Sequence, residues 1–434
     1  MQATSNMLYG IHDKLPPKRL IVAALQQVVA CFVATVLIPQ ICGVPIAPAM
    51  VGAGIGTLIY MFFTKGRSPM FISSSGAFVA AVIGALALGT APNFTAVALG
   101  GMMVAIVYGV VGMALARYGT GWLHKYLPPV VIGPVVAVIG LNLATFLPTY
   151  FQMNGQYSLL GMALGGLTLV ITALLSHYGK GFIRNLPFLV SMLIVYGIAS
   201  VLTLCGIPII DFSVFQGVHL FQFPDFSFFH ISFTHFDWSL IPQIAMLFIP
   251  ISIVGISEHM SDHKALSSVI GTDLTDDPGL GLTLIGDGVA SAIGCYLCGL
   301  PNTSYGESVG TTGFSKICSK YVMALAAGIM ALAGFIGPLQ AFLVSIPSAI
   351  FGGCAAILYG YIALSGIRTI ATSGIDFNDN KNAIILSTVL TLGVGGVVLN
   401  FGVISFGTTA LALIVGVVMN LILKGKTSNG WEQI

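Results

Sequence analysis

The feature that most constrains this chain is a succession of long apolar runs that contain almost no charged residues. Of its 434 residues, 56% are hydrophobic and 7% are charged, whereas about 25% of the residues in a soluble domain are charged. An α-helix needs about 20 consecutive apolar residues to cross a bilayer. The sequence therefore predicts an all-α polytopic membrane protein. A formal net charge of +2, without a basic patch, gives no indication of nucleic-acid binding.

The apolar runs divide the chain into fourteen candidate membrane spans. We expect them at residues 20–42, 44–64, 69–90, 94–116, 127–150, 158–177, 184–207, 240–262, 279–298, 299–315, 321–344, 346–367, 383–400 and 402–423. Residues 1–19 and 425–434 are then terminal tails. Residues 208–239 form one long loop outside the cytoplasm.

The distribution of positive charge supports this count. If the N-terminus lies in the cytoplasm, all 16 Lys and Arg residues fall on the cytoplasmic side, and the loop 208–239 contains none. Cytoplasmic loops of membrane proteins carry such an excess of Lys and Arg. We therefore expect a multi-pass protein of the cytoplasmic (inner) membrane, with both termini in the cytoplasm.

Two of the predicted spans are interrupted by residues that disfavour a helix. PMFISSSGAF (69–78) lies in the third span and PNTSYGES (301–308) in the tenth. Both begin with Pro and pass through Ser or Thr to Gly, which all weaken a helix. They occupy corresponding positions if the chain consists of two seven-span repeats, 20–207 and 240–424. Because seven is odd, the second repeat would be inverted relative to the first.

These interruptions predict a binding site. Non-helical backbone at membrane depth is tolerated only where it is buried in protein or lines a cavity. Paired interruptions in two halves indicate the substrate site of a transporter, where helix N-termini offer N–H groups to a ligand. The alternative is a pair of kinked or re-entrant segments that bind nothing.

Four acidic residues fall within or beside predicted spans: Glu258, Asp262, Asp287 and Glu307. A carboxyl group at the centre of a span costs about 2.5–3.5 kcal/mol to insert, so such residues are functional candidates. Glu258 and Asp262 are one helical turn apart and share a face. Asp287 could instead only hydrogen-bond a broken backbone. The neighbouring His259 and His263 could be solvated or have their hydrogen bonds satisfied within the protein.

No Lys or Arg is predicted to lie deep in a span. The predicted site therefore has acids and no fixed base, which argues against an inorganic anion or a carboxylate as the substrate. It favours a neutral hydrogen-bonding molecule, a cation or protons. Carboxyl groups removed from water can take up and release a proton near neutral pH.

The combined motifs resemble a known family of transporters. ISEHMSDH (256–263) is followed by PNTSYGESVGTTGFSK (301–316), and the N-terminal part contains LQQVVACFVATVLIP, GAGIGTLIYMFFTKGRSP and SSSGAF. Together they resemble the nucleobase–ascorbate transporter family, most closely its bacterial uracil permeases. The resemblance extends over essentially the whole sequence.

This resemblance implies fourteen spans in two inverted repeats of seven, with a core domain, a gate domain and short extended strands in spans 3 and 10. It implies elevator-like movement of the core and binding of the base by Glu258. Glu307 matches a signature position that is glutamate in uracil permeases and usually glutamine in purine-type members. Asp262 stands where uracil permeases can have histidine and purine-type members aspartate. Ser308 and Ser315 depart from the usual Asn and Thr.

The chemistry of a pyrimidine base fits these residues. A protonated carboxyl offers one donor and one acceptor, which match adjacent N–H and C=O groups of uracil, whereas an ionised carboxylate only accepts. Binding of the base then depends on the proton, as symport requires. The expected substrate-binding residues are Glu258, Glu307, Gly76, Ala77, Phe78, Tyr305 and Gly306; the expected proton-coupling residues are Glu258, Asp262, Glu307 and Asp287. Phe78 and Tyr305 could equally be core aromatics, and Gly76 stands where the family can have an aromatic.

The sequence thus predicts a proton-coupled uracil symporter that is not an enzyme. One rival is a xanthine or other purine permease. Asp262 favours this rival, and Glu307 argues against it. A same-fold sulfate or bicarbonate carrier, an ion channel and an intramembrane enzyme are further rivals. Expected partners are a nucleobase, protons, membrane lipid and a second copy of the chain in a homodimer. No metal and no cofactor are expected.

Overall fold

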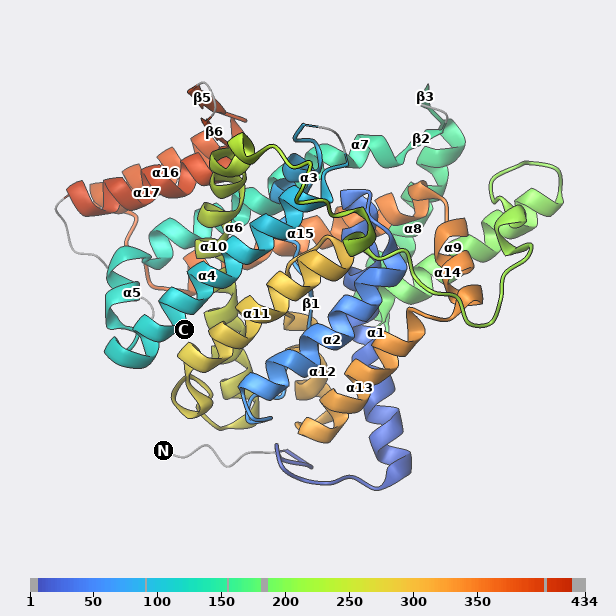
Figure 1. Ribbon diagram of the computed structural model, residues 1–434, viewed down its shortest axis with the longest axis horizontal. Coiled ribbons are helices and arrows are strands. Elements are labelled where there is room, and N and C mark those ends of the chain that lie inside the picture. Colours follow the sequence, from blue (N-terminus) through green and yellow to red (C-terminus); the bar gives the residue numbers. More distant parts are fainter. Residues whose placement is uncertain (1–6, 90–91, 154–155, 181–185, 402–403, 424–434) are drawn as a thin grey trace.

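The structure, a computed structural model, describes residues 7–89, 92–153, 156–180, 186–401 and 404–423, which are mostly helical (Figure 1). Its first helices are α1 (Pro17–Cys42), α2 (Ile46–Phe63), α3 (Val79–Leu86), α4 (Phe94–Tyr118), α5 (Gly121–Tyr126), α6 (Pro129–Leu143), α7 (Leu147–Tyr150), α8 (Leu159–Tyr178) and α9 (Pro187–Leu204). They are followed by α10 (Ile241–Ile270), α11 (Leu280–Cys298), α12 (Gly306–Ser315), α13 (Lys320–Ala333), α14 (Gly337–Ser345), α15 (Ser348–Thr372), α16 (Asn380–Val394) and α17 (Thr408–Ile422). The short strands are β1 (Ile72–Ser74), β2 (Gln152–Met153), β3 (Gln156–Tyr157), β4 (Asn302–Ser304), β5 (Leu399–Phe401) and β6 (Ile404–Phe406).

Within the described ranges, nine helical segments are long and apolar enough to cross a membrane. They contain α1, α2, α4, α6 with α7, α8, α9, α10, α11 and α15. The helices α13 and α17 are apolar but shorter, with 14 and 15 residues. The predicted class, a polytopic helical membrane protein, agrees with this arrangement.

Several predicted spans have the wrong boundaries. Residues 321–344 do not form one helix, because α13 ends at Ala333 and α14 begins at Gly337. The intervening Gly334 and the following Pro338 explain this break, since neither residue supports a helix interior. The eighth span, predicted at 240–262, continues as α10 to Ile270. Asp262 therefore lies about two turns inside a helix rather than at its end.

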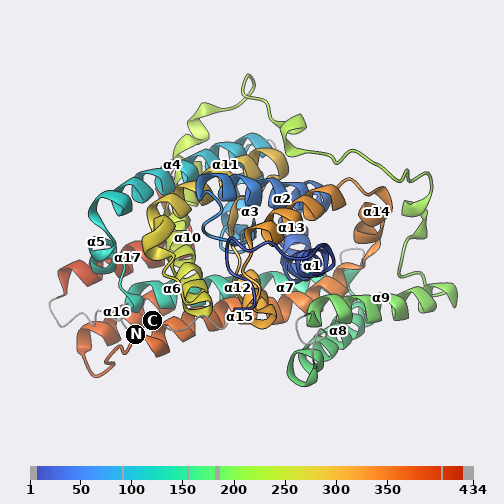
Figure 2. The same ribbon diagram turned by 90° about the horizontal axis from the view of Figure 1, so that it is seen from below.

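The helices pack in two groups. The first helix group consists of α1–α4 and α10–α13, in which α4 packs on α11 and α2 on α13. The second helix group consists of α6–α9 and α15–α17, in which α15 packs on α6 and α8, and α16 packs on α6 and α17. Figure 2 shows the two groups as layers, with α10 and α12 near the boundary between them.

Small residues let the helices approach closely inside each group. A Cβ atom at Gly112 of α4 would lie 2.7 Å from the carbonyl oxygen of Gly281 in α11. A Cβ atom at Gly366 of α15 would likewise overlap the carbonyl oxygen of Gly133 in α6. Both separations are shorter than van der Waals contact, so these crossings require glycine. Close packing at small residues is a main source of helix association within membranes.

The two interrupted segments meet inside the first helix group. The strands β1 and β4 pair antiparallel, with Ile72 opposite Ser304 and Ser74 opposite Asn302. Neighbouring helices hydrogen-bond some of the polar groups of the strands: the Ser291 hydroxyl of α11 donates to the Asn302 carbonyl at 2.6 Å, and Thr35 of α1 hydrogen-bonds Ser73 at 2.8 Å. The predicted extended strands in these segments are therefore present, and each leads directly toward a helix N-terminus, that of α3 or α12.

The long connection between α9 and α10 packs on the first helix group. Its aromatic rings contact each other and rings of neighbouring elements: Phe228 stacks on Tyr296 of α11 at 5.8 Å, and Phe221 stacks on Phe335 at 5.4 Å. Backbone hydrogen bonds from Gln222 to Phe335 (2.9 Å) and from Gly337 to Leu220 (3.0 Å) fix it beside α14. The connection therefore joins the two helix groups while remaining attached to the first.

Candidate functional site

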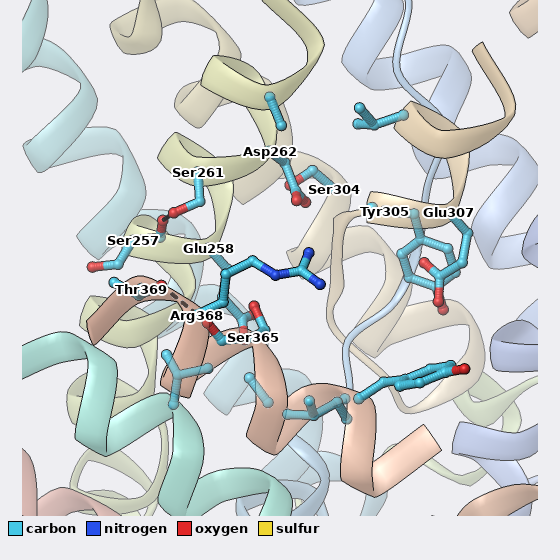
Figure 3. Close-up of a pocket in the computed structure, with 18 of the residues that line it drawn as sticks. Ser257, Glu258, Ser261, Asp262, Ser304, Tyr305, Glu307, Ser365, Arg368 and Thr369 are labelled. Atoms are coloured by element: carbon cyan, nitrogen blue, oxygen red, sulfur yellow. Dashed lines mark hydrogen bonds between the residues drawn. The ribbon is translucent and has the colours of Figure 1, made fainter. Parts of the chain in front are cut away.

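A cavity of about 620 Å³ lies between the two helix groups, beside the paired strands (Figure 3). The first group lines it from α1, from the residues before α3, from α10 and from β4–α12; the second group lines it from α6 and α15. The lining residues are Ala34, Ile38, Gly76, Ala77, Ile132, Val136, Ser257, Glu258, Ser261, Asp262, Ala265, Ser304, Tyr305, Gly306, Glu307, Val309, Leu358, Tyr361, Ile362, Ser365, Arg368, Thr369 and Thr372.

One face of α10 supplies the acidic wall of this cavity. Glu258 and Asp262 line it together with Ser257 and Ser261, as the one-turn spacing predicts. The Asp262 carboxylate accepts a hydrogen bond of 2.8 Å from the Ser304 hydroxyl of β4. The Glu258 carboxylate has no hydrogen-bond or ion-pair partner in the described part of the chain. Its capacity for hydrogen bonds is therefore free for a molecule that enters the cavity.

The opposite face of α10 is buried in the first helix group. His259 and His263 are both fully buried, and their rings lie 4.0 Å apart. His259 binds the Thr283 hydroxyl through Nε2 at 2.9 Å, and His263 binds the Tyr60 hydroxyl through Nε2 at 2.7 Å. Of the two interpretations of these histidines, the structure supports the one in which the protein satisfies their hydrogen bonds.

Asp287 belongs to this buried face rather than to the cavity. Its Oδ2 lies 2.8 Å from Nδ1 of His259, and both side chains are completely buried. Its Oδ1 has no hydrogen-bond partner among the described residues. Asp287 does not line the cavity, so any role in proton coupling would act through α10. That role stays a prediction.

The N-terminus of α12 points into the cavity. Gly306 and Glu307 begin this helix directly after β4, and both are exposed to the cavity. The first N–H groups of a helix have no intrahelical partner and attract acceptors and negative charge. Gly76 and Ala77 stand in the corresponding place before α3. A Cβ atom at Gly76 would lie 3.3 Å from Ile362, so the missing aromatic side chain leaves room for α15.

The two predicted aromatic residues have different positions. Tyr305 lines the cavity, and its hydroxyl donates to the Ser74 carbonyl at 2.7 Å, which ties the two interrupted segments together. Phe78 is fully buried and packs against Phe248 with ring centroids 6.1 Å apart. The structure thus brings six of the seven predicted substrate-binding residues to the cavity, and places Phe78 behind its wall.

Arg368 is the main residue that sequence reasoning missed. The fifth span of the second half was expected to end at residue 367, which placed Arg368 in a loop. The structure extends α15 to Thr372, and the Arg368 side chain points into the cavity (Figure 3). The expectation that the site has no fixed positive charge is therefore wrong. The polar residues Ser365, Arg368, Thr369 and Thr372 lie at positions i, i+3, i+4 and i+7, the pattern of one face of a helix, which could have revealed this face.

A second cavity of about 300 Å³ meets the first at Glu307. The two cavities share Ala34, Glu307, Leu358 and Tyr361. The second one is otherwise lined by Ala30, Val33, Ser176, Pro187, Phe188, Gly310 and Thr311. It therefore lies between α1 and α12 of the first helix group and α8, α9 and α15 of the second. Glu307 therefore stands at the junction of the two cavities.

The site has the chemistry of a binding pocket for a polar molecule of modest size. Carboxyl groups, hydroxyl groups, a guanidinium and free backbone N–H groups converge on a cavity whose remaining walls are apolar, as is typical of ligand sites. In the described residues, His, Cys, Asp and Glu form no group that could hold a metal ion. Gly306 and Glu307 provide donors, and Glu258 can donate or accept according to its protonation.

Known proteins resemble this chain in sequence and in fold. The sequence model of a family described as "Permease family" matches residues 18–402. The uracil permease of Bacillus caldolyticus and that of Bacillus subtilis are each 37% identical to the chain; the alignments cover 96% and 95% of this chain and 94% of each permease. Among solved structures, the inward-facing murine anion transporter Slc26a9 aligns with a TM-score of 0.65 at 13% identity, over 94% of this chain and 69% of that one. This last similarity concerns the fold alone.

Proposed function

The chain belongs to the nucleobase–ascorbate transporter family of permeases, and we propose that it carries uracil across the cytoplasmic membrane in symport with protons. One observation carries the proposal: Glu258 of α10 and the N-terminus of α12 with Glu307 face the same cavity beside the paired strands. The uracil permeases at 37% identity support uracil as the substrate. Transport is the activity of this family, and we propose no enzymatic activity and no cofactor.

In this proposal Glu258 forms hydrogen bonds with one edge of the base. Its protonated carboxyl donates to a carbonyl oxygen of uracil and accepts from the adjacent N–H. The N–H groups of Gly306 and Glu307 can donate to another carbonyl oxygen, because the helix begins there. Tyr305 holds the two segments in place through its bond to Ser74. A planar base therefore finds donors and acceptors on two walls of the cavity.

Proton coupling follows from the same carboxyl groups. An ionised Glu258 would offer acceptors only, so loss of its proton weakens binding of the base. Glu307 and Asp262 line the same cavity and can exchange protons with water there. Asp287 does not line the cavity, and it would act on coupling only by holding α10 in place through its bond to His259. We propose that these residues link one proton or more to each base that crosses.

We further propose that the two halves form inverted repeats of seven spans. The packing pairs come in matched sets: α4 on α11 corresponds to α13 on α2, and α8 on α15 corresponds to α16 on α6. The first helix group then corresponds to the core domain and the second to the gate domain. An elevator movement of the core relative to the gate carries the binding site across the membrane. The cavity extends toward the C-terminal ends of α10 and α15, which would lie on the cytoplasmic side in the proposed topology. Residues 1–6 and 424–434, which include the whole predicted C-terminal tail, lie outside the described residues.

A purine permease is the second candidate, and one observation favours it. Asp262 lines the cavity and is positioned by Ser304, and aspartate is the residue that purine-type members have there. A cavity of about 620 Å³ also has room for a bicyclic base. The presence of Arg368 removes the charge argument against an anion carrier, but the family match favours a base. Membrane lipid and a second copy of the chain are the further proposed partners.

Uptake of labelled uracil into proteoliposomes tests the proposal. We expect uptake that depends on an inward proton gradient and that excess xanthine does not inhibit. Strong inhibition by xanthine would favour the purine permease. Uracil uptake that does not depend on the proton gradient would contradict symport. Absence of uracil uptake would contradict the assigned substrate.

A further inference from the structure

Arg368 faces the acidic residues of the cavity from the opposite helix group. It projects from α15, whereas Glu258 and Asp262 project from α10 and Glu307 from α12 (Figure 3). Among the described lining residues it is the only Lys or Arg. The remaining titratable groups of the lining are the tyrosines Tyr305 and Tyr361. Every carboxylate among the described lining residues that could pair with Arg368 therefore comes from the first helix group.

The guanidinium has no such partner in the present arrangement. No described residue forms an ion pair or hydrogen bond with its nitrogen atoms. A guanidinium has five N–H donors and cannot lose its charge. Asp262 already accepts a bond from Ser304, whereas Glu258 has no partner. A long, flexible side chain and a carboxylate without a partner among the described residues thus face each other across the cavity.

Two partners of Glu258 exclude each other chemically. An ionised carboxylate is an acceptor only and is the natural partner of a guanidinium. A protonated carboxyl offers the donor and acceptor that the edge of a base requires. An opposite charge nearby favours the ionised form. Binding of the base with its proton and pairing with Arg368 therefore compete for the same two oxygen atoms.

We propose that Arg368 is the alternate partner of Glu258 and enforces the coupling of proton and base. This proposal rests on the proposed function. In the empty carrier Glu258 is ionised and pairs with Arg368 across the two helix groups. A proton from the aqueous phase then binds a Glu258 oxygen, the ion pair separates and the carboxyl binds the base. On release the base leaves, the proton returns to water and Glu258 pairs with Arg368 again.

The test compares Arg368→Gln, which removes the charge, with Arg368→Lys, which keeps it. Arg117→Gln, at the exposed end of α4 and outside the cavity, is the matched control. Uracil binding is measured in purified protein between pH 5 and pH 9. In Arg368→Gln we expect binding to persist to higher pH, with the midpoint moved by about one pH unit. Arg368→Lys and Arg117→Gln should follow the wild type.

Several results would overturn the proposal. They are an unchanged pH profile in Arg368→Gln, an Arg368→Lys profile that matches Arg368→Gln, and loss of binding at every pH in a folded Arg368→Gln protein. The last result would show that Arg368 contacts the base directly. If the wild type binds no uracil at any pH, the proposed function fails, and the pairing is then judged from stability alone.

Thermal unfolding without substrate provides that independent measurement. The ion pair stabilises the protein only while Glu258 is ionised, so its contribution is present at high pH and lost as the pH falls. We expect Arg368→Gln to lower the melting temperature at pH 8 and to have little effect at pH 5. In a Glu258→Gln background the same change should have little effect at either pH. A decrease that is equal at both pH values, or that persists with Glu258→Gln, would contradict the pairing.

Discussion

Both faces of α10 carry titratable residues, but those on one face line a cavity and those on the other are buried in the protein. Glu258 and Asp262 face a cavity, and the Glu258 carboxylate has no described protein partner. His259 and His263, each one residue further along the chain, are completely buried, and both ring nitrogens of each are hydrogen-bonded. Burial of a polar group requires satisfied hydrogen bonds, whereas a binding site requires unsatisfied ones. The comparison indicates that the cavity face serves the ligand and the buried face holds α10 in place.

Replacement of Glu258 tests the cavity face with the largest expected effect. Glu258→Ala removes both the donor and the acceptor that read the base, and a hydrogen bond contributes about 0.5–1.5 kcal/mol. We expect uracil affinity to fall about 10- to 100-fold and uptake to be lost, as measured with labelled uracil. At pH 5, where Glu258 is protonated and the proposed pair with Arg368 is absent, the melting temperature should change little. Full uphill uptake by this variant would show that Glu258 does not bind the base.

Replacement of Glu307 separates proton coupling from binding. Glu307→Gln keeps one donor and one acceptor but cannot titrate. We expect uracil binding within a few-fold of the wild type, while accumulation driven by a proton gradient is lost. The measurement is uptake into proteoliposomes with and without the gradient, with exchange of uracil in both directions as the control. Wild-type accumulation in this variant would remove Glu307 from the coupling mechanism.

Replacement of His259 tests the buried face. His259→Ala leaves the fully buried Asp287 without its partner, and a buried polar group that loses its hydrogen-bond partner costs about 1–3 kcal/mol. We expect a lower unfolding midpoint in detergent and, at temperatures where the protein stays folded, nearly wild-type affinity for uracil. Loss of affinity without loss of stability would contradict the division between the two faces.

Replacement of Ser304 has the smallest expected effect. Ser304→Ala removes the hydrogen bond of 2.8 Å to Asp262, which we expect to weaken uracil binding only a few-fold because water in the cavity can replace the donor. A titration of the purified protein with uracil measures the change. Ser365→Ala, on the opposite wall of the cavity, is the matched control. An effect as large as that of Glu258→Ala would mean that Asp262, rather than Glu258, is the main contact.

Much of the cavity face could be predicted because its signals are local. The Pro, Ser and Gly residues of the two interrupted segments predict extended backbone in otherwise apolar spans, and β1 and β4 occupy those positions. The spacing of Glu258 and Asp262 predicts a shared face of one helix, which lines the cavity. Each of these inferences needs only a few neighbouring residues and the cost of polar groups in a membrane.

The features of the site that the sequence does not predict depend on contacts between residues far apart in the sequence. Arg368 was placed in a loop because an arginine near the end of an apolar run is typical of a cytoplasmic boundary, yet α15 continues beyond it. Phe78 was a candidate ligand contact because of its place before α3, but Phe248 of α10 buries it. The His259–Asp287 pair joins α10 to α11, which no local pattern indicates. The interruption between α13 and α14 was missed although Gly334 and Pro338 signal it.

The most direct test of the central claim is a titration of the purified protein with uracil, with Glu258→Gln and His259→Gln measured side by side with the wild type. Both variants replace a titratable side chain by the same amide on adjacent positions of one helix. The division between the two faces predicts that Glu258→Gln changes the pH dependence of binding, while His259→Gln keeps it and lowers only the unfolding midpoint. An altered pH dependence in His259→Gln together with an unchanged one in Glu258→Gln would contradict this division and place the proton on the buried face.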